Sequence, residues 1–209
     1  MGLLSLLMNN PVTFLLLAVP LLYSVILHEI AHGLVASWFG DNTAKYSGRL
    51  TLNPMAHLDL MGTLMLFFVG FGWAKPVPVN YNNLNNSRLG IMAVALAGCI
   101  TNILLATVAI FLMQLQVFNT NPAFATIFPI VIKINIILAA FNLIPIPPLD
   151  GSKVLMGFLP EEAQSNLARI EPYGFFIIII LLYTGILYPV IDFIQSILYG
   201  LIGLFFGIF

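Results

Sequence analysis

Long apolar stretches divide this chain, and they restrict it to one main way of folding. In a helix, about 20 apolar residues cross the hydrocarbon core of a bilayer. A run at 61–72 is shorter, contains Gly62, Gly70 and Gly72 and leads toward prolines, so we expect it to re-enter the membrane or lie at its surface. We therefore predict an all-α polytopic membrane protein with five to six transmembrane helices. Five stretches are long enough, or nearly so: 11–38, 89–113, 124–145, 173–187 and 190–208.

Composition supports this class and excludes others. The chain of 209 residues is 60% hydrophobic and 7% charged, with a net charge of −1, whereas about a quarter of a soluble domain is charged. Such a chain has no basic face for nucleic acid. Cys99 is the single cysteine, which rules out a disulfide framework and a thiolate zinc site. We expect one integral membrane domain over 1–209, with no removable signal peptide and no separate soluble domain.

A metal-binding pattern lies within the first long apolar stretch. His28-Glu29-Ile30-Ala31-His32 follows seventeen uncharged residues, 11–27. Two histidines four residues apart share one helix face and can bind the same tetrahedral metal, and Glu29 beside them can act as a general base on water. Polar and charged groups at membrane depth cost several kcal/mol unless they are paired, hydrated or ligated. The pattern therefore predicts a zinc site with one Zn2+ per chain.

A third ligand is needed to complete such a site. Asp150 is the best candidate, because it ends Asn142-Leu143-Ile144-Pro145-Ile146-Pro147-Pro148-Leu149-Asp150-Gly151, where prolines break an apolar helix. A broken helix at membrane depth is tolerated where it lines a protein cavity. Asn142 could donate a hydrogen bond to a developing oxyanion. The alternative is that Asp150 and Gly151 only form a turn and cap for a short helix beginning at Ser152.

Positive charges predict the orientation in the membrane. Lys and Arg side chains gather in 40–60, 73–88 and 146–172 but are absent from 114–123 and 184–190. The positive-inside rule places the three basic segments in the cytoplasm. The N-terminus is then outside, the C-terminus inside and the metal site near the cytoplasmic side. Lys133 remains inside a span, where it needs a partner or a watery cavity.

These residues carry a resemblance to a known family. The His28-to-His32 motif, Gly98-Cys99-Ile100-Thr101-Asn102, and Asn142 through Gly151 resemble the site-2 protease family of intramembrane zinc metalloproteases. Gly48 to Pro54 and Gly72 to Asn80 are similar to its compact prokaryotic branch without a PDZ domain. The resemblance implies that His28, His32 and Asp150 bind zinc, that Glu29 is the general base, and that the protein resides in a bacterial or archaeal plasma membrane.

The resemblance also implies a strand-like element near 46–60 that pairs with substrate. Gly48 to Pro54 itself suggests a short strand that ends at a proline. Strand addition at Leu50, Leu52 and Asn53 could hold an unwound substrate backbone. Asn102 is a further candidate for substrate binding, although its spacing from Gly98 is more typical of helix packing with a hydrogen bond. For His57 we expect local hydrogen bonds.

The predicted activity is therefore zinc-dependent hydrolysis of peptide bonds in or near transmembrane segments of membrane proteins, as in regulated intramembrane proteolysis. Substrate selection falls to the membrane core, to an accessory protein or to an upstream protease. Two alternatives remain open: an ion or metal transporter that uses the His and Glu cluster as a path, and an inactive relative that only binds transmembrane helices. Turnover distinguishes the protease from both.

Overall fold

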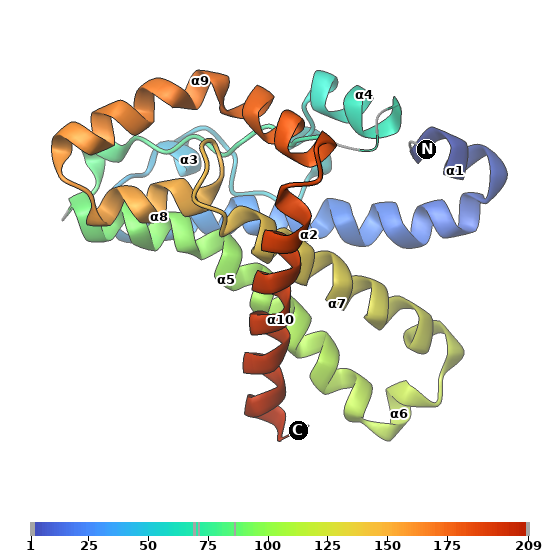
Figure 1. The fold of residues 1–209 in the computed structure, drawn as a ribbon. Coiled ribbons are helices and arrows are strands. Elements are labelled where there is room, and N and C mark those ends of the chain that lie inside the picture. Colours follow the sequence, from blue (N-terminus) through green and yellow to red (C-terminus); the bar gives the residue numbers. More distant parts are fainter. Residues whose placement is uncertain (1–2, 69, 71, 86, 208–209) are drawn as a thin grey trace.

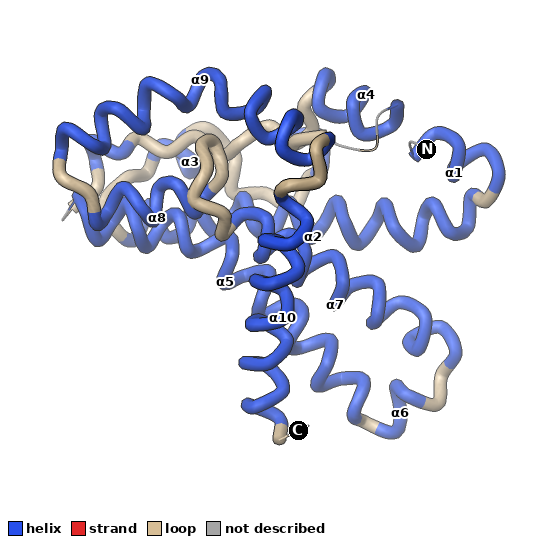
Figure 2. The backbone as a smooth tube through the Cα atoms, viewed as in Figure 1, coloured by secondary structure: helices blue, strands red, loops and turns tan. Residues whose placement is uncertain are grey.

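The computed structural model describes residues 3–68, 70, 72–85 and 87–207. Regular structure in these residues is helical, and Figure 2 shows helices joined by loops without a strand. The helices are α1 (Leu3–Asn9), α2 (Pro11–Trp38), α3 (Thr43–Tyr46), α4 (Leu60–Phe68), α5 (Ser87–Gln114), α6 (Gln116–Asn119), α7 (Pro122–Asn142), α8 (Asp150–Phe158), α9 (Glu161–Tyr183) and α10 (Leu187–Phe206), with 3-10 turns at Pro54–Ala56 and Tyr81–Asn83.

Five of the described helices are long and apolar enough to cross a membrane: α2, α5, α7, α9 and α10. This confirms the all-α polytopic class. The fourth apolar stretch, 173–187, lies mostly within α9, and this helix begins earlier, at Glu161, and continues through Pro172 to Tyr183. Its first turns are polar, so apolar content alone does not reveal them. Gly185, with a φ of +81°, separates α9 from α10.

Local sequence explains where two of the long helices begin. Asn10 caps α2 by accepting a hydrogen bond from the Thr13 amide (3.1 Å), and Asn121 caps α7 by accepting one from the Ala123 amide (3.0 Å). Each cap is followed by a proline at the first helical position, where the missing N–H costs nothing. Asparagine followed by proline therefore starts both spans.

The short apolar run after α3 does not form a spanning helix. α4 has nine residues, which at 1.5 Å per residue gives about 14 Å, roughly half of the hydrocarbon thickness. Gly62 packs so closely against the Trp73 carbonyl that a Cβ atom would collide with it. This contact folds the chain back on itself, and the placement of the segment as a re-entrant or interfacial element stays a prediction.

The strand expected within 46–60 is absent from the described residues. Asn53 instead accepts a hydrogen bond from the Met55 amide (3.1 Å) and starts the 3-10 turn at Pro54. The β-type pairing that forms is one isolated antiparallel bridge between Leu58 and Ala74. The Asn-Pro pair thus favours a turn over an extended edge.

α5 is the centre of the molecule and packs against α2, α7 and α8 (Figure 1). Small side chains line part of this packing, with Ala106 and Ala109 on α5 and Ala139 and Ala140 on α7 all buried. Small residues let membrane helices approach closely. The close packing of α5 against both α2 and α8 brings residues that are far apart in the sequence to one buried site.

Candidate metal centre

His28, His32 and Asp150 meet between α2 and α8. The Nε2 atoms of the two histidines lie 3.0 Å apart, and Oδ2 of Asp150 lies 3.1 Å from Nε2 of His28 and 3.2 Å from Nε2 of His32. His28 is 6% exposed and His32 is 8% exposed. One nitrogen or oxygen atom of each residue therefore points at a common centre inside the protein.

The three atoms fit a zinc ion. Zinc binds His nitrogen and carboxylate oxygen at about 2.0–2.2 Å in a tetrahedron, whose ligand atoms then lie about 3.3–3.6 Å apart. The separations of 3.0–3.2 Å among His28, His32 and Asp150 are close to that edge length. A set of two histidines and one carboxylate leaves the fourth position for water or substrate, as in catalytic rather than structural zinc sites.

Hydrogen bonds orient both histidines with Nε2 toward the centre. Nδ1 of His32 lies 2.7 Å from the Val94 carbonyl, and Nδ1 of His28 lies 2.6 Å from Oδ1 of Asn102. A carbonyl oxygen only accepts, so Nδ1 of His32 carries the proton and Nε2 keeps its lone pair for a metal. Asn102 is fully buried and lies behind a metal ligand, away from any open surface.

The break between α7 and α8 places Asp150 at the centre. Gly151 lies so close to the Leu143 and Ile144 carbonyls that a side chain there would collide with the Leu143 oxygen. A short helix does form here, but α8 begins at Asp150 rather than at Ser152, so Asp150 is the first residue of the helix and not its cap. That first residue belongs to the metal centre. Gly98 leaves room on the other side, because a Cβ atom there would collide with the His28 ring.

Glu29 is held beside the centre by a backbone amide. Its Oε2 atom accepts a hydrogen bond from the Val77 N–H at 2.8 Å. Val77 lies in the loop between α4 and α5, between two prolines. The contact leaves Oε1 of Glu29 free of any described hydrogen bond, so this oxygen is available to accept a proton.

The other predicted site residues lie in less direct places. Nδ2 of Asn142 donates to the Leu138 carbonyl one turn earlier in α7 (3.0 Å), and its role as an oxyanion donor stays a prediction. Leu52 is exposed, and Leu50 and Asn53 lie in the same loop without forming a strand. Their role in substrate binding also stays a prediction. Nε2 of His57 donates to the Thr51 carbonyl at 2.8 Å, a local hydrogen bond of the kind expected.

The sequence did not predict several contacts around the centre, including the Val94 carbonyl on His32, the Val77 amide on Glu29, and Asn135, which hydrogen-bonds to Asn102. The last two left a signal. Asn135 is a polar residue inside an apolar span, and Val77 supplies the N–H between Pro76 and Pro78. Neither signal shows which residue will be contacted, since Val77 lies 48 positions from Glu29 and Asn135 lies 33 positions from Asn102.

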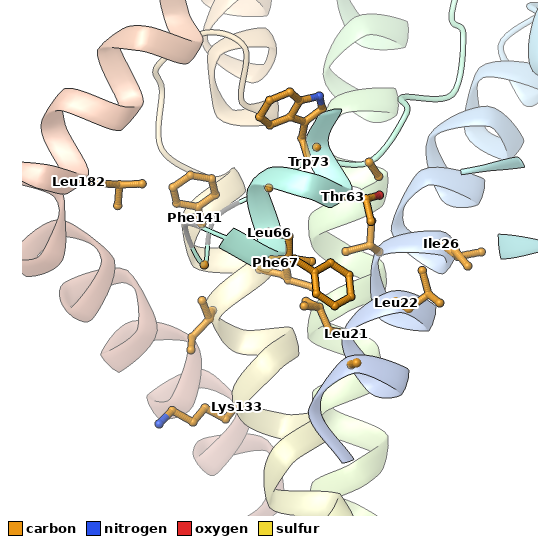
Figure 3. Close-up of a pocket in the computed structure, with 18 of the residues that line it drawn as sticks. Leu21, Leu22, Ile26, Thr63, Leu66, Phe67, Trp73, Lys133, Phe141 and Leu182 are labelled. Atoms are coloured by element: carbon orange, nitrogen blue, oxygen red, sulfur yellow. The ribbon is translucent and has the colours of Figure 1, made fainter. Parts of the chain in front are cut away.

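A large apolar cavity lies between α2, α4, α7 and α10, and its lining on α2 ends at Ile26, two residues before His28. Its volume is about 830 Å³, and Figure 3 shows Trp73 and Lys133 toward opposite ends of it. Lys133 and Asp192 both line it. The expectation that Lys133 has a partner or a watery cavity stays a prediction, since the cavity that it lines is mostly apolar. Along α2, the lining residues Ala18, Leu22 and Val25 lie eleven, seven and four positions before Glu29 and share its helix face.

Known proteins with similar sequences agree with this centre. The family model described as Peptidase family M50 matches residues 116–184. The chain is 39% identical over 187 residues to YwhC of Bacillus subtilis, covering 84% of this chain and 85% of that protein. It is 30% identical over 179 residues to Rip2 of Mycolicibacterium smegmatis, covering 82% of this chain and 68% of that protein. Both relatives are named as zinc metalloproteases. No solved structure matches the chain.

The match to YwhC is extensive enough to show the family. The residues of this chain that match the family model include α7 and Asp150. The centre supplies the chemistry that these names require, with two histidines and a carboxylate around one point and Glu29 beside them. The helices supply the membrane setting. We conclude that the chain belongs to peptidase family M50, the site-2 protease family, and that it is a zinc-dependent membrane metalloprotease.

Proposed function

We propose that this protein cuts peptide bonds within or near transmembrane segments of membrane proteins, as in regulated intramembrane proteolysis. The observation that carries the proposal is the apolar cavity of about 830 Å³ whose lining on α2 ends two residues before the metal ligand His28. Its volume lies near the top of the range of about 300–1,000 Å³ that is typical of ligand pockets. One side of its wall comes from α2, α7 and α10, which are long and apolar enough to span a membrane, and another side from α4 and its flanking loops. An apolar segment of another protein is therefore a suitable occupant.

The cavity leads toward the catalytic residues. Ile26 lies one turn before Glu29 on α2, and Ala74 lies three residues before Val77 in the loop that holds Glu29. A peptide in the cavity would therefore reach the centre along α2. A helical peptide hides its carbonyls in its own hydrogen bonds, so the substrate must unwind locally before it can react.

The side chains of this protein divide the chemistry between them. When bound by His28, His32 and Asp150, zinc supplies a Lewis acid for a peptide carbonyl and for water. Glu29 keeps one carboxylate oxygen on the Val77 amide and offers the other to a proton. It would take that proton from the attacking water and later deliver it to the leaving amine. The buried histidines exclude bulk water from the same point.

The side of the membrane and the partners belong to the same proposal. Lys45, Arg49, Lys75, Arg88 and Lys153 lie on α3, on α8, at the start of α5 and in the loops between, and positive charge favours the cytoplasmic side. We propose a cytoplasm-facing active site in a bacterial or archaeal plasma membrane. The substrate is a membrane protein with a transmembrane helix, and an accessory protein or an upstream protease selects it.

The test is cleavage of single-span membrane peptides by purified protein in detergent. We expect the wild type to cut inside or beside the apolar segment, and Glu29→Gln to bind zinc but not to cut. Glu162→Gln, which changes an exposed carboxylate on α9, is the matched control and should cut like the wild type. Mass spectrometry of the products gives the position of the cut.

Two results would contradict the proposal. Cleavage confined to soluble peptides, with apolar segments untouched, would make this a membrane-bound protease of soluble substrates. Equal cleavage by Glu29→Gln and wild type would remove Glu29 from the role of general base while leaving the zinc assignment intact.

A further inference from the structure

A chain of buried polar side chains runs away from His28 into the core. Oδ1 of Asn102 lies 2.6 Å from Nδ1 of His28, and Nδ2 of Asn102 donates to Oδ1 of Asn135 at 2.8 Å. Nδ2 of Asn135 donates to Ser24 Oγ at 2.9 Å and to the Val131 carbonyl at 2.8 Å. Asn102 and Asn135 are both 0% exposed. The chain links α2, α5 and α7 behind the metal ligand.

The direction of every hydrogen bond in this chain follows from its far end. The Val131 carbonyl can only accept, so the amide end of Asn135 that faces it must be the NH2 group. The oxygen of Asn135 then faces Asn102 and can only accept, so Asn102 must turn its own NH2 group toward it. The oxygen of Asn102 is left for His28, whose Nδ1 must therefore carry the proton.

We propose that Asn135, fixed by the Val131 carbonyl, is a positioning residue that sets the tautomer of His28 for zinc. A neutral imidazole has one N–H, so a proton on Nδ1 leaves the lone pair on Nε2, the atom that faces His32 and Asp150. His32 obtains the same tautomer in one step from the Val94 carbonyl. His28 obtains it in three steps, through two asparagines.

We call the hydrogen bonds from the Val131 carbonyl through Asn135 and Asn102 to His28 the relay. The relay is needed because Asn102 alone does not determine which end of its amide faces His28. An asparagine amide has almost the same shape when it is turned by 180°, and the turned form would offer a donor to Nδ1 of His28. The proton would then sit on Nε2 and block the metal. Asn135 cannot turn in this way, since both hydrogens of its amide are used, by Val131 and by Ser24. It therefore fixes Asn102.

The first test is zinc affinity of the full-length protein in detergent, measured by competition with a chromophoric chelator. Asn135→Leu keeps a similar side-chain size but removes the anchor. We expect zinc affinity to fall about tenfold, the lower end of what loss of a residue behind a metal ligand costs. Histidine ¹⁵N NMR of the zinc-free protein, with Asp150→Ala added to remove the carboxylate that also faces Nε2 of His28, should show a second His28 tautomer in Asn135→Leu that is absent when Asn135 is present.

The decisive variant adds Asn102→Asp to Asn135→Leu. A carboxylate has no donor, so it can only accept from Nδ1 of His28 and needs no anchor to do so. We expect it to restore the single tautomer and most of the zinc affinity. Ile136→Ala is the packing control, because Ile136 is fully buried on the same helix and takes no part in the relay. It should keep zinc affinity within about twofold, since packing alone does not select a tautomer.

The proposal is overturned if Asn135→Leu binds zinc like the wild type with one His28 tautomer, or if Asn102→Asp fails to rescue it. Equal losses in Asn135→Leu and Ile136→Ala would likewise reduce Asn135 to a packing residue. The readouts use zinc and no substrate. A failure here would therefore leave the proposed peptidase activity untouched, and absence of peptide cleavage would leave the relay untouched.

Discussion

At the scale of single residues, the contact between Glu29 and Val77 shows how a loop can control a catalytic carboxylate. Pro76 and Pro78 have no N–H, so Val77 supplies the only amide donor of the three, and Glu29 accepts it. Residues before a proline are held in extended conformations, which fixes Lys75 and Val77. The loop is thus stiff where it touches Glu29. Its amide holds the carboxylate by one oxygen, Oε2, and leaves Oε1 without a described hydrogen bond.

Replacing Val77 by proline should remove this hydrogen bond and also change the packing of a buried side chain. Proline suits an extended segment that already has prolines on both sides. We expect zinc content to stay normal and kcat on a membrane peptide to fall about 10- to 100-fold, because a small misplacement of a catalytic group is costly. Val77→Ala keeps the N–H but loses side-chain packing, so it should retain much more activity. A Val77→Pro enzyme with a wild-type kcat would contradict this role.

At the scale of elements, Asp41 holds the Val77 loop against the end of α2. Its carboxylate is fully buried and accepts hydrogen bonds from the Thr43 hydroxyl and amide, from the Asn80 amide (2.7 Å) and from Nδ2 of Asn83 (3.0 Å). Burial by itself raises the pKa of Asp41, but these hydrogen bonds outweigh it and lower the pKa below the ordinary value of 3.8. The folded protein therefore favours the charged form.

A lowered pKa gives the stability contribution of Asp41 a definite pH dependence. The contribution is complete above the unfolded pKa of 3.8 and is lost as pH falls from there through the folded pKa. We expect Asp41→Asn to lower Tm at neutral pH, since bonds to a charged acceptor are worth about 1.5–3 kcal/mol each. The difference in Tm from the wild type should shrink below about pH 4.

Thermal unfolding in detergent, followed by tryptophan fluorescence at a series of pH values, measures this difference. Glu162→Gln removes an exposed carboxylate and should follow the wild type at every pH. A gap between Asp41→Asn and the wild type that stays constant down to acidic pH would show that the charge of Asp41 does not stabilise the loop.

The elements also show which parts of this fold the sequence predicts. Apolar length found the five candidate spans, because the bilayer imposes one length on all of them. It missed the start of α9 at Glu161, since polar turns outside the apolar run carry no such signal. The strand prediction near Leu50 was wrong because the Asn53 side chain accepts a hydrogen bond from the Met55 amide and so starts a turn instead of an extended segment. Short segments depend on single contacts, and these are not visible in hydropathy.

At the scale of the whole molecule, the metal centre joins distant parts of the chain. His32 and Asp150 are 118 residues apart in sequence, yet they share one point, with α5 packed against both α2 and α8. The motif spacing predicted the ligand types because helix geometry fixes residues four apart. It could not predict the Asn135 relay, which depends on how α7 packs beside α5. Tertiary packing brings those side chains together.

This arrangement predicts that zinc stabilises a defined part of the molecule. A ligand that binds only the folded site contributes about 4 kcal/mol at a thousand times its Kd, and here it ties α2 to α8. Chelating zinc should therefore speed hydrogen exchange around His28, His32 and the 143–150 loop. The far end of α10 near Phe206, which has no ligand, should exchange at the same rate with and without zinc.

Asp150→Ala is the control for this exchange experiment. This variant removes the zinc ligand on α8, so zinc can no longer link α8 to α2. Amide hydrogen exchange in its α8 should therefore already be fast and should respond little to the chelator. Wild-type exchange that rises evenly over all helices on chelation would mean that zinc supports global folding. Exchange that does not change at all would mean that packing of α2, α5 and α8 forms the site without help. A local response confined to α2 and α8 is expected, because α5 and α7 keep their mutual packing through Ala106, Ala139 and their neighbours whether or not the metal is present.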